Sequence, residues 1–78
     1  MRIKKKTWIL TFESITQAMA AEKFCMEQNL PGRLIPIPRE ITAGCGLSWK
    51  TAPEARDEVL TALKKAGYRW EAEYVLEL

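Results

Sequence analysis

Hydrophobic residues recur along this chain of 78 residues with two different periods, and the order of those periods constrains the fold more than any other feature. Four segments alternate with a period of two, or are rich in β-branched and aromatic residues, as β-strands are. In the last of them an apolar face alternates with glutamates, and that face comprises Trp70, Ala72, Tyr74, Leu76 and Leu78. The four predicted strands are Lys6–Phe12, Arg33–Ile37, Leu47–Lys50 and Arg69–Leu78.

Two further segments repeat apolar residues at helical spacing. The first predicted helix runs from Ser14 to about Asn29, because Ser14 and Gln17 have the spacing of a capping box and a Pro-Gly pair follows. The second opens with another capping box, Thr51-Ala52-Pro53-Glu54, and ends at Gly67. Their predicted core stripes are Ala18, Ala21, Phe24 and Cys25 in the first, and Ala55, Val59, Ala62, Leu63 and Ala66 in the second.

The resulting order, strand-helix-strand-strand-helix-strand, predicts an α+β fold of the ferredoxin-like type. In that fold two helices cover one face of a four-stranded antiparallel sheet. We expect a single domain over residues 1–78, since a chain this short has no room for a second core. Pro36 and Pro38 cannot donate to a strand ladder, so the strand 33–37 is expected at one sheet edge and the last strand at the other.

The charge balance gives little reason to expect a nucleic-acid partner. Twelve basic and ten acidic side chains leave a formal net charge of +2. The basic cluster Arg2, Lys4, Lys5 and Lys6 is interpreted as a solvated chain end. Three tryptophans could stack on bases if they lay on an open sheet face, but the glutamates of the last strand would repel phosphates there. These are Trp8, Trp49 and Trp70.

The sequence predicts neither a membrane segment nor a secretion signal. No apolar run approaches the ~20 residues that cross a bilayer, and the run from Trp8 to Phe12 is too short for a signal peptide. We therefore expect a cytoplasmic protein, in which Cys25 and Cys45 are free thiols. With two cysteines and no histidine, the chain offers no usual zinc site. No catalytic triad or phosphate loop is present either, so no metal or cofactor is expected.

The strongest candidate for a functional site is the loop Ile35–Gly46, in which Cys45 stands between Gly44 and Gly46. A right-handed crossover would bring Cys45 to the start of the first helix, around 14–16. Arg39 lies in the same loop, and the lysines that end the second helix would point to the same rim. A helix N-terminus and nearby cations favour a thiolate, and flanking glycines let a second molecule or an anion approach. This pattern is typical of a nucleophilic or sulfur-carrying cysteine.

The same residues allow a simpler interpretation. Gly44-Cys45-Gly46 could be a tight turn with a small, inert thiol, because the surroundings of a cysteine decide its reactivity. Cys25 is predicted to be a core residue, since it belongs to the apolar stripe of the first helix.

The run 34–46, LIPIPREITAGCG, resembles the hallmark of the putative selenium/sulfur (Se/S) carrier protein-like family, a family of small bacterial domains. That hallmark is an Ile-Pro-x-Pro-Arg motif with Cys-Gly a few residues later. Ala18 and the Glu22-Lys23 pair of the first helix are also similar to family positions, whereas Ile37 stands where the family more often has threonine. The matching residues are Ile35, Pro36, Pro38, Arg39, Cys45 and Gly46.

The resemblance implies that Cys45 carries sulfur or selenium as a persulfide or selenosulfide. A cysteine desulfurase-type protein would be the donor and another protein the acceptor, so the chain would be a carrier rather than a true enzyme. Arg39 would stabilise the anion, and Pro36 and Pro38 would fix the loop. The alternative is a non-catalytic module that binds a small ligand or a protein through the loop 35–46. We also expect a weak homodimer through the last strand or an aromatic sheet face.

Overall fold

The computed structural model describes residues 5–42 and 44–78. Arg2 and Lys4 of the predicted basic cluster, and Ala43 of the candidate loop, lie outside these ranges. The elements are β1 (Lys6–Thr11), α1 (Ile15–Glu27), β2 (Arg33–Pro36), β3 (Leu47–Thr51), a short 3-10 helix η1 (Pro53–Ala55), α2 (Arg56–Lys65) and β4 (Ala72–Glu77).

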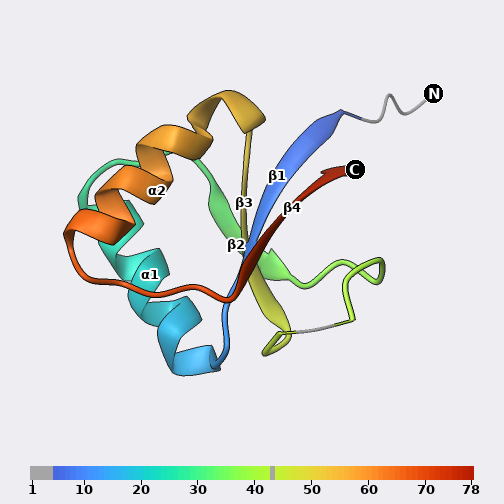
Figure 1. Cartoon of the computed structure of the whole chain (residues 1–78), viewed down its shortest axis with the longest axis horizontal. Coiled ribbons are helices and arrows are strands. Elements are labelled where there is room, and N and C mark those ends of the chain that lie inside the picture. The colour runs from blue at the N-terminus through green and yellow to red at the C-terminus, as the bar shows by residue number, and fades with distance from the viewer. Residues whose placement is uncertain (1–4, 43) are drawn as a thin grey trace.

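The four strands form one antiparallel sheet in the order β2-β3-β1-β4. Figure 1 shows both helices on the same side of this sheet. The order and the layering confirm the predicted ferredoxin-like α+β fold. They also place β2 and β4 at the two edges of the sheet. The prolines of β2 and the ferredoxin-like order predicted these two positions.

The strand register assigns every strand residue to one of two faces. Trp8 and Leu10 of β1 pair with Thr51 and Trp49 of β3, and these residues face the helices. The intervening Ile9 pairs with Lys50 and with Tyr74, so these side chains lie on the helix-free face. The two faces therefore differ in what covers them, because both helices lie over the same face.

The main core lies between the sheet and the two helices. Burying these apolar side chains contributes about 25 cal/mol per Å² removed from water, which makes this layer the principal source of stability. The buried members are Trp8, Leu10, Phe12, Ala18, Ala21, Cys25, Trp49, Val59 and Leu63. Trp8 and Trp49 are therefore core residues and do not present an open aromatic face.

The cap of α1 agrees closely with the sequence prediction. The amide of Gln17 donates to the Ser14 hydroxyl oxygen at 3.1 Å, as a capping box requires. The Gln17 side chain reaches back one residue further than predicted, and its amide oxygen accepts from the Glu13 amide at 3.2 Å. Gly67 follows α2 with a φ of +84°, the left-handed conformation expected after a helix end.

Two predictions about α2 are wrong. Thr51 does not cap a helix, because it is buried at the end of β3, and η1 begins after Ala52 without a side-chain cap. Pro53 instead occupies the first turn, where its missing amide hydrogen costs nothing. Ala66, predicted on the core stripe, is exposed at the C-cap, whereas Val59 and Leu63 are buried.

The predicted alternation of the last strand is correct only from Ala72 onward. Ala72, Tyr74 and Leu76 share the helix-free face, since they pair with Thr11, Ile9 and Thr7 in turn. Trp70 lies before the strand and packs against the core on the helix side, so it does not continue that face.

Candidate functional site: the loop of Cys45

The candidate loop connects the edge strand β2 to β3 and is closed at its base by backbone pairing. The Ile37 amide donates to the Gly46 carbonyl oxygen at 2.9 Å, which extends the β2-β3 hairpin by one pair. Further out, the Ile41 amide donates to the Pro38 carbonyl oxygen at 3.0 Å and forms a turn around Arg39. Pro36 and Pro38 thus stand on either side of the point where the hairpin opens.

The loop is anchored on the helix-free face of the sheet. Ile41 is buried, and so are Ile9 and Ser48 on the face that neither helix covers. Figure 1 shows the loop on this side of the sheet. Because Ile9 is apolar and lies on a face that neither helix covers, the loop that carries the buried Ile41 provides a second layer on this side of the sheet.

Gly44 and Gly46 adopt backbone conformations that other residues rarely take. Their φ angles are +108° and +95°, which explains why both positions hold glycine. A Cβ at Gly44 would lie 3.0 Å from Cδ1 of Ile37 and 3.5 Å from Oε1 of Glu71, so this glycine also lets the loop approach the sheet. A Cβ at Gly46 would meet nothing within 4 Å, so the space beside Cys45 is open on that side.

Cys45 lies where the sequence predicted, at the end of β1 from which α1 starts. Its amide donates to the carbonyl oxygen of Phe12 at 3.2 Å, two residues before the N-cap Ser14. The side chain is partly buried and packs against the helix-side core. Its Sγ donates a weak hydrogen bond to the Leu47 carbonyl oxygen at 3.8 Å. Cys45 therefore lies at the rim of the core, and the residue is exposed only in part.

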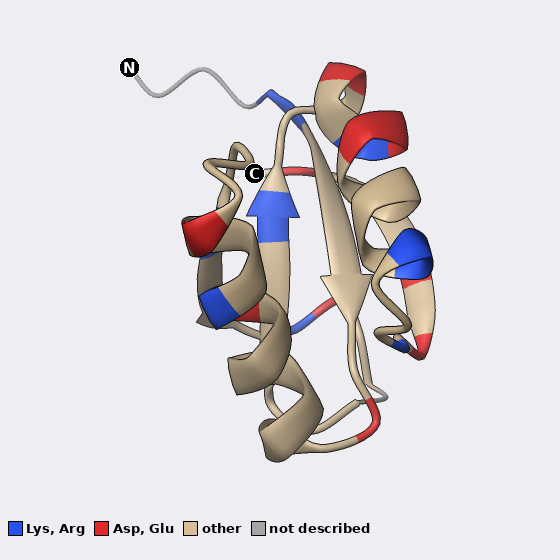
Figure 2. Cartoon of the chain, turned by 90° about the vertical axis from the view of Figure 1, so that its left-hand side faces the viewer, with Lys and Arg blue, Asp and Glu red and all other residues tan. Residues whose placement is uncertain are grey.

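The predicted cations are Arg39 in the loop and Lys64 and Lys65 at the end of α2, and all three are exposed. Figure 2 shows the acidic residues of α2 at its start and the lysines Lys64 and Lys65 at its end. The first turn of α1 and the segment 67–69 after α2 line one cavity of about 310 Å³, so the two helix ends share a rim. Among the described residues, no hydrogen bond or ion pair joins Arg39 or either lysine to Cys45.

Cys25 is placed very differently from Cys45. It is 1% exposed, within the core between α1 and the sheet. Burial raises the pKa of the Cys25 thiol to about 11, because the thiolate would lose its hydration. The predicted core role of Cys25 is thus consistent with both its position and its ionisation.

A polar group beneath the loop was not predicted from the sequence. The Thr11 hydroxyl donates to Oε1 of Glu71 at 3.3 Å, and Glu71 approaches Gly44. Ser48 pairs with Thr11 across β1 and β3, and its buried Oγ has no hydrogen-bond partner among residues 5–42 and 44–78. No sequence signal pointed to these residues, because only the strand register brings them under the loop.

Neither a metal centre nor a membrane span emerges from the part of the chain that the structure describes. Within it, no three His, Cys, Asp or Glu side chains gather as metal ligands would. Over the same residues, neither helix has the length and apolar character needed to span a bilayer.

The chain was also compared with known proteins. Residues 7–75 match the model of one family, described as "Putative Se/S carrier protein-like". No curated protein and no solved structure matches the chain. The family match includes both helices, all but the ends of β1 and β4, and the whole Cys45 loop. Since it covers most of the sequence, the chain belongs to the Se/S carrier protein-like family.

Proposed function

We propose that the protein carries sulfur or selenium on Cys45. The observation that carries this proposal is the position of Cys45: a partly exposed thiol between two glycines, with open space beside Gly46, in a chain of the Se/S carrier-like family. Only Cys45 of the two cysteines suits this role, because Cys25 is buried in the core.

The transfer step needs no external oxidant. The Cys45 thiolate attacks the terminal sulfur of a donor persulfide, R–S–SH. A new S–S bond forms on Cys45, the S–S bond of the donor breaks, and the donor leaves as the thiolate R–S⁻. The sulfane sulfur keeps its oxidation state, and an acceptor thiolate removes it by the same reaction in reverse. Selenium would be carried in the same way as a selenosulfide.

Several residues have roles in this proposal. Gly44 and Gly46 leave room for the donor, while Pro36 and Pro38 stiffen the hairpin where the loop opens. Arg39, exposed on the turn of the loop, attracts the anionic donor or stabilises the terminal sulfur anion. The Cys45 side chain must give up its contact with the Leu47 carbonyl oxygen before transfer, since a thiolate has no hydrogen to donate.

Loading with a small persulfide tests the proposal. The protein is incubated with glutathione persulfide, the thiols are trapped with iodoacetamide, and the masses are mapped by peptide. We expect the mass of one added sulfur on the Cys45 peptide, removed again by dithiothreitol. Cys25→Ala should load like the wild type and Cys45→Ser should not load. Arg39→Ala should load more slowly, whereas Lys23→Ala, which removes an exposed cation from α1, should not. Sulfur on Cys25, or on neither cysteine, would refute the carrier proposal.

A second function is favoured by the partial burial of the thiol. Because Cys45 packs against the core, the same loop could bind a small ligand or a protein without covalent chemistry. If this second function is correct, Cys45 does not take up sulfur from a persulfide. Substitution of the exposed Arg39 should still abolish binding of the ligand or protein that the wild-type loop binds.

A further inference from the structure

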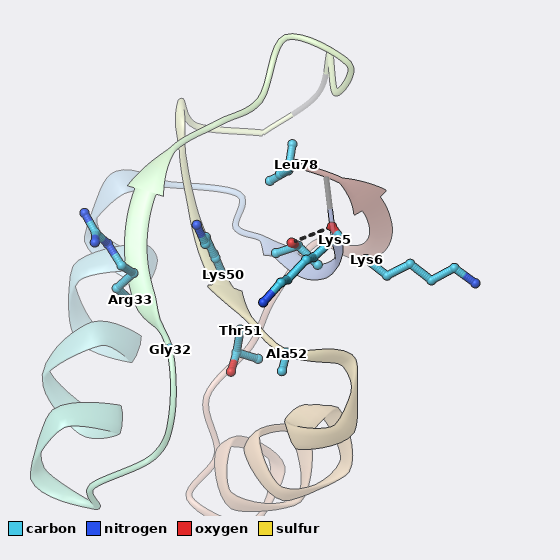
Figure 3. Close-up of a pocket in the computed structure, with 9 residues that line it drawn as sticks. Lys5, Lys6, Gly32, Arg33, Lys50, Thr51, Ala52 and Leu78 are labelled. Carbon is cyan, nitrogen blue, oxygen red and sulfur yellow. Dashed lines mark hydrogen bonds between the residues drawn. The ribbon is translucent and has the colours of Figure 1, made fainter. Parts of the chain in front are cut away.

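The end of the sheet furthest from Cys45 carries a hollow lined by basic side chains. It lies where β1 begins and β3 ends and has a volume of about 530 Å³. Its four cations come from three places in the sequence, and no aspartate or glutamate lines it. In Figure 3 the side chain of Lys50 lies between those of Arg33 and Lys5, whereas that of Lys6 extends away from them. Lys6 pairs with Glu77 of β4, on the face opposite to that of Arg33 and Lys50.

The strand register places two of these cations directly opposite each other. Arg33 of β2 pairs with Lys50 of β3, so both side chains project from the same face. Like charges at opposed positions destabilise a sheet. The pairing of Arg33 with Lys50 therefore destabilises the sheet at this point. Local violations of this kind are expected at functional sites.

Gly32 fixes this arrangement by letting β2 approach β3 closely. Its φ is +121°, and a Cβ there would lie 2.5 Å from the Lys50 carbonyl oxygen and 2.5 Å from Nε1 of Trp49. The Trp49 indole nitrogen donates to the Pro31 carbonyl oxygen at 3.3 Å and holds the same segment from the core side. Arg33 and Lys50 are thus brought together by the backbone and not by flexible side chains.

The cations of the hollow differ from the arginine that has a structural partner. Arg56 contacts the carboxylates of Glu73 and Asp57 at 2.6 and 2.7 Å. In the described part of the chain, none of the four cations of the hollow has a carboxylate within 4.0 Å. The positive charges of Lys5, Arg33 and Lys50 are therefore not balanced by a carboxylate among the described residues, whereas Lys6 lies opposite Glu77.

We propose that this hollow binds a small molecule with a multiply charged anionic head group, either a phosphate ester or a set of carboxylates. Its volume falls within the roughly 300–1,000 Å³ of pockets that hold small molecules. Lysine and arginine supply charge-assisted hydrogen bonds to such a head group. Ala52, Leu78 and the aliphatic lysine stems leave room for a small uncharged body. This site is separate from Cys45 and does not depend on the proposed sulfur transfer.

The test is a titration followed by ¹H–¹⁵N NMR at low ionic strength. The probes are inorganic pyrophosphate, glycerol 3-phosphate and citrate, so that the phosphate and carboxylate head groups are compared. We expect saturable shifts at the amides of 32–33 and 50–52, and none at Gly44 or Gly46. Cys45→Ser should bind the probes like the wild type.

Charge variants decide whether the site is specific. Lys50→Glu should weaken binding by about 10-fold or more, since a hydrogen bond to a charged group contributes more than a neutral one. Arg33→Gln, on the other strand, provides a second variant should Lys50→Glu unfold. Lys23→Glu makes the same change of net charge on the exposed side of α1 and should bind as the wild type does. Equal weakening by Lys23→Glu, or shifts that never saturate, would overturn the proposal. Tighter binding of an oligonucleotide than of every small anion would overturn it as well.

Discussion

The two thiols should react with iodoacetamide at very different rates in the folded protein, and this difference can be worked out from their surroundings. Cys45 is partly exposed on a loop, and Cys25 is 1% exposed in the core. We expect Cys45 to be alkylated first at neutral pH. The experiment uses the wild type together with the single-thiol variants Cys25→Ala and Cys45→Ser.

Burial slows Cys25 in two ways, through its ionisation and through access. Its pKa rises from an ordinary value of 9.0 to about 11. Because each unit of pKa changes the thiolate fraction tenfold, burial alone reduces that fraction about 100-fold. The reagent also cannot reach a core thiol until the surrounding structure opens locally, which lowers the rate further. Cys25 should therefore react more than about 100-fold more slowly than an exposed thiol of ordinary pKa.

Peptide mapping by mass spectrometry at successive times measures both rates in one sample. The control is the same reaction in concentrated guanidinium chloride, where the two thiols should react at similar rates because burial is gone. Equal labelling of Cys25 and Cys45 in the native protein would refute the assignment of one to the core and the other to the site.

Four further predictions concern stability and association. Glu73→Ala should destabilise the fold by about 1–3 kcal/mol in urea unfolding, because the buried indole nitrogen of Trp8 donates to Glu73 at 3.1 Å and would lose its acceptor. Arg56→Ala should destabilise the fold less, since the ion pair between Arg56 and Glu73 is exposed. The hydrogen bond from Arg56 lowers the pKa of Glu73, so the effect of Arg56→Ala should be complete above pH 4.5 and fade as the pH falls through the lower, folded-state pKa. Gly32→Ala should cost about 1–3 kcal/mol, because a positive φ and a close backbone contact exclude a side chain there. Val75, 56% exposed on the edge strand β4, should support a weak homodimer that Val75→Lys shifts towards monomer in sedimentation equilibrium.

Each of these has a result that contradicts it. If Glu73→Gln, which keeps an acceptor, is as unstable as Glu73→Ala, the indole hydrogen bond is not the cause. A pH-independent effect of Arg56→Ala would exclude the ionised pair as its source. Wild-type stability in Gly32→Ala would mean that the start of β2 can move away from β3. If the wild-type protein remains monomeric at all concentrations, the edge strand β4 does not form the predicted homodimer.

Local chemistry in the sequence was enough to predict most of the fold. The Ser14 cap, Gly67 after α2 and the prolines beside β2 act through neighbouring residues, so their consequences are visible without a tertiary structure. The location of Cys45 could also be predicted, because chain order and crossover handedness determine which strand end meets which helix end. The start of α2 could not be predicted, since Thr51 is a residue type that commonly caps helices but here is the last residue of β3.

The tertiary structure alone decided what lies on each face of the sheet. Alternation in β4 showed that Ala72, Tyr74 and Leu76 share a face, but only the pairing with β1 assigns that face to the side without helices. The same applies to Arg33 and Lys50, which are 17 residues apart in the sequence and are brought opposite each other by register. A pattern of period two specifies sides relative to one strand, whereas the identity of each side depends on long-range pairing and on which layer covers it.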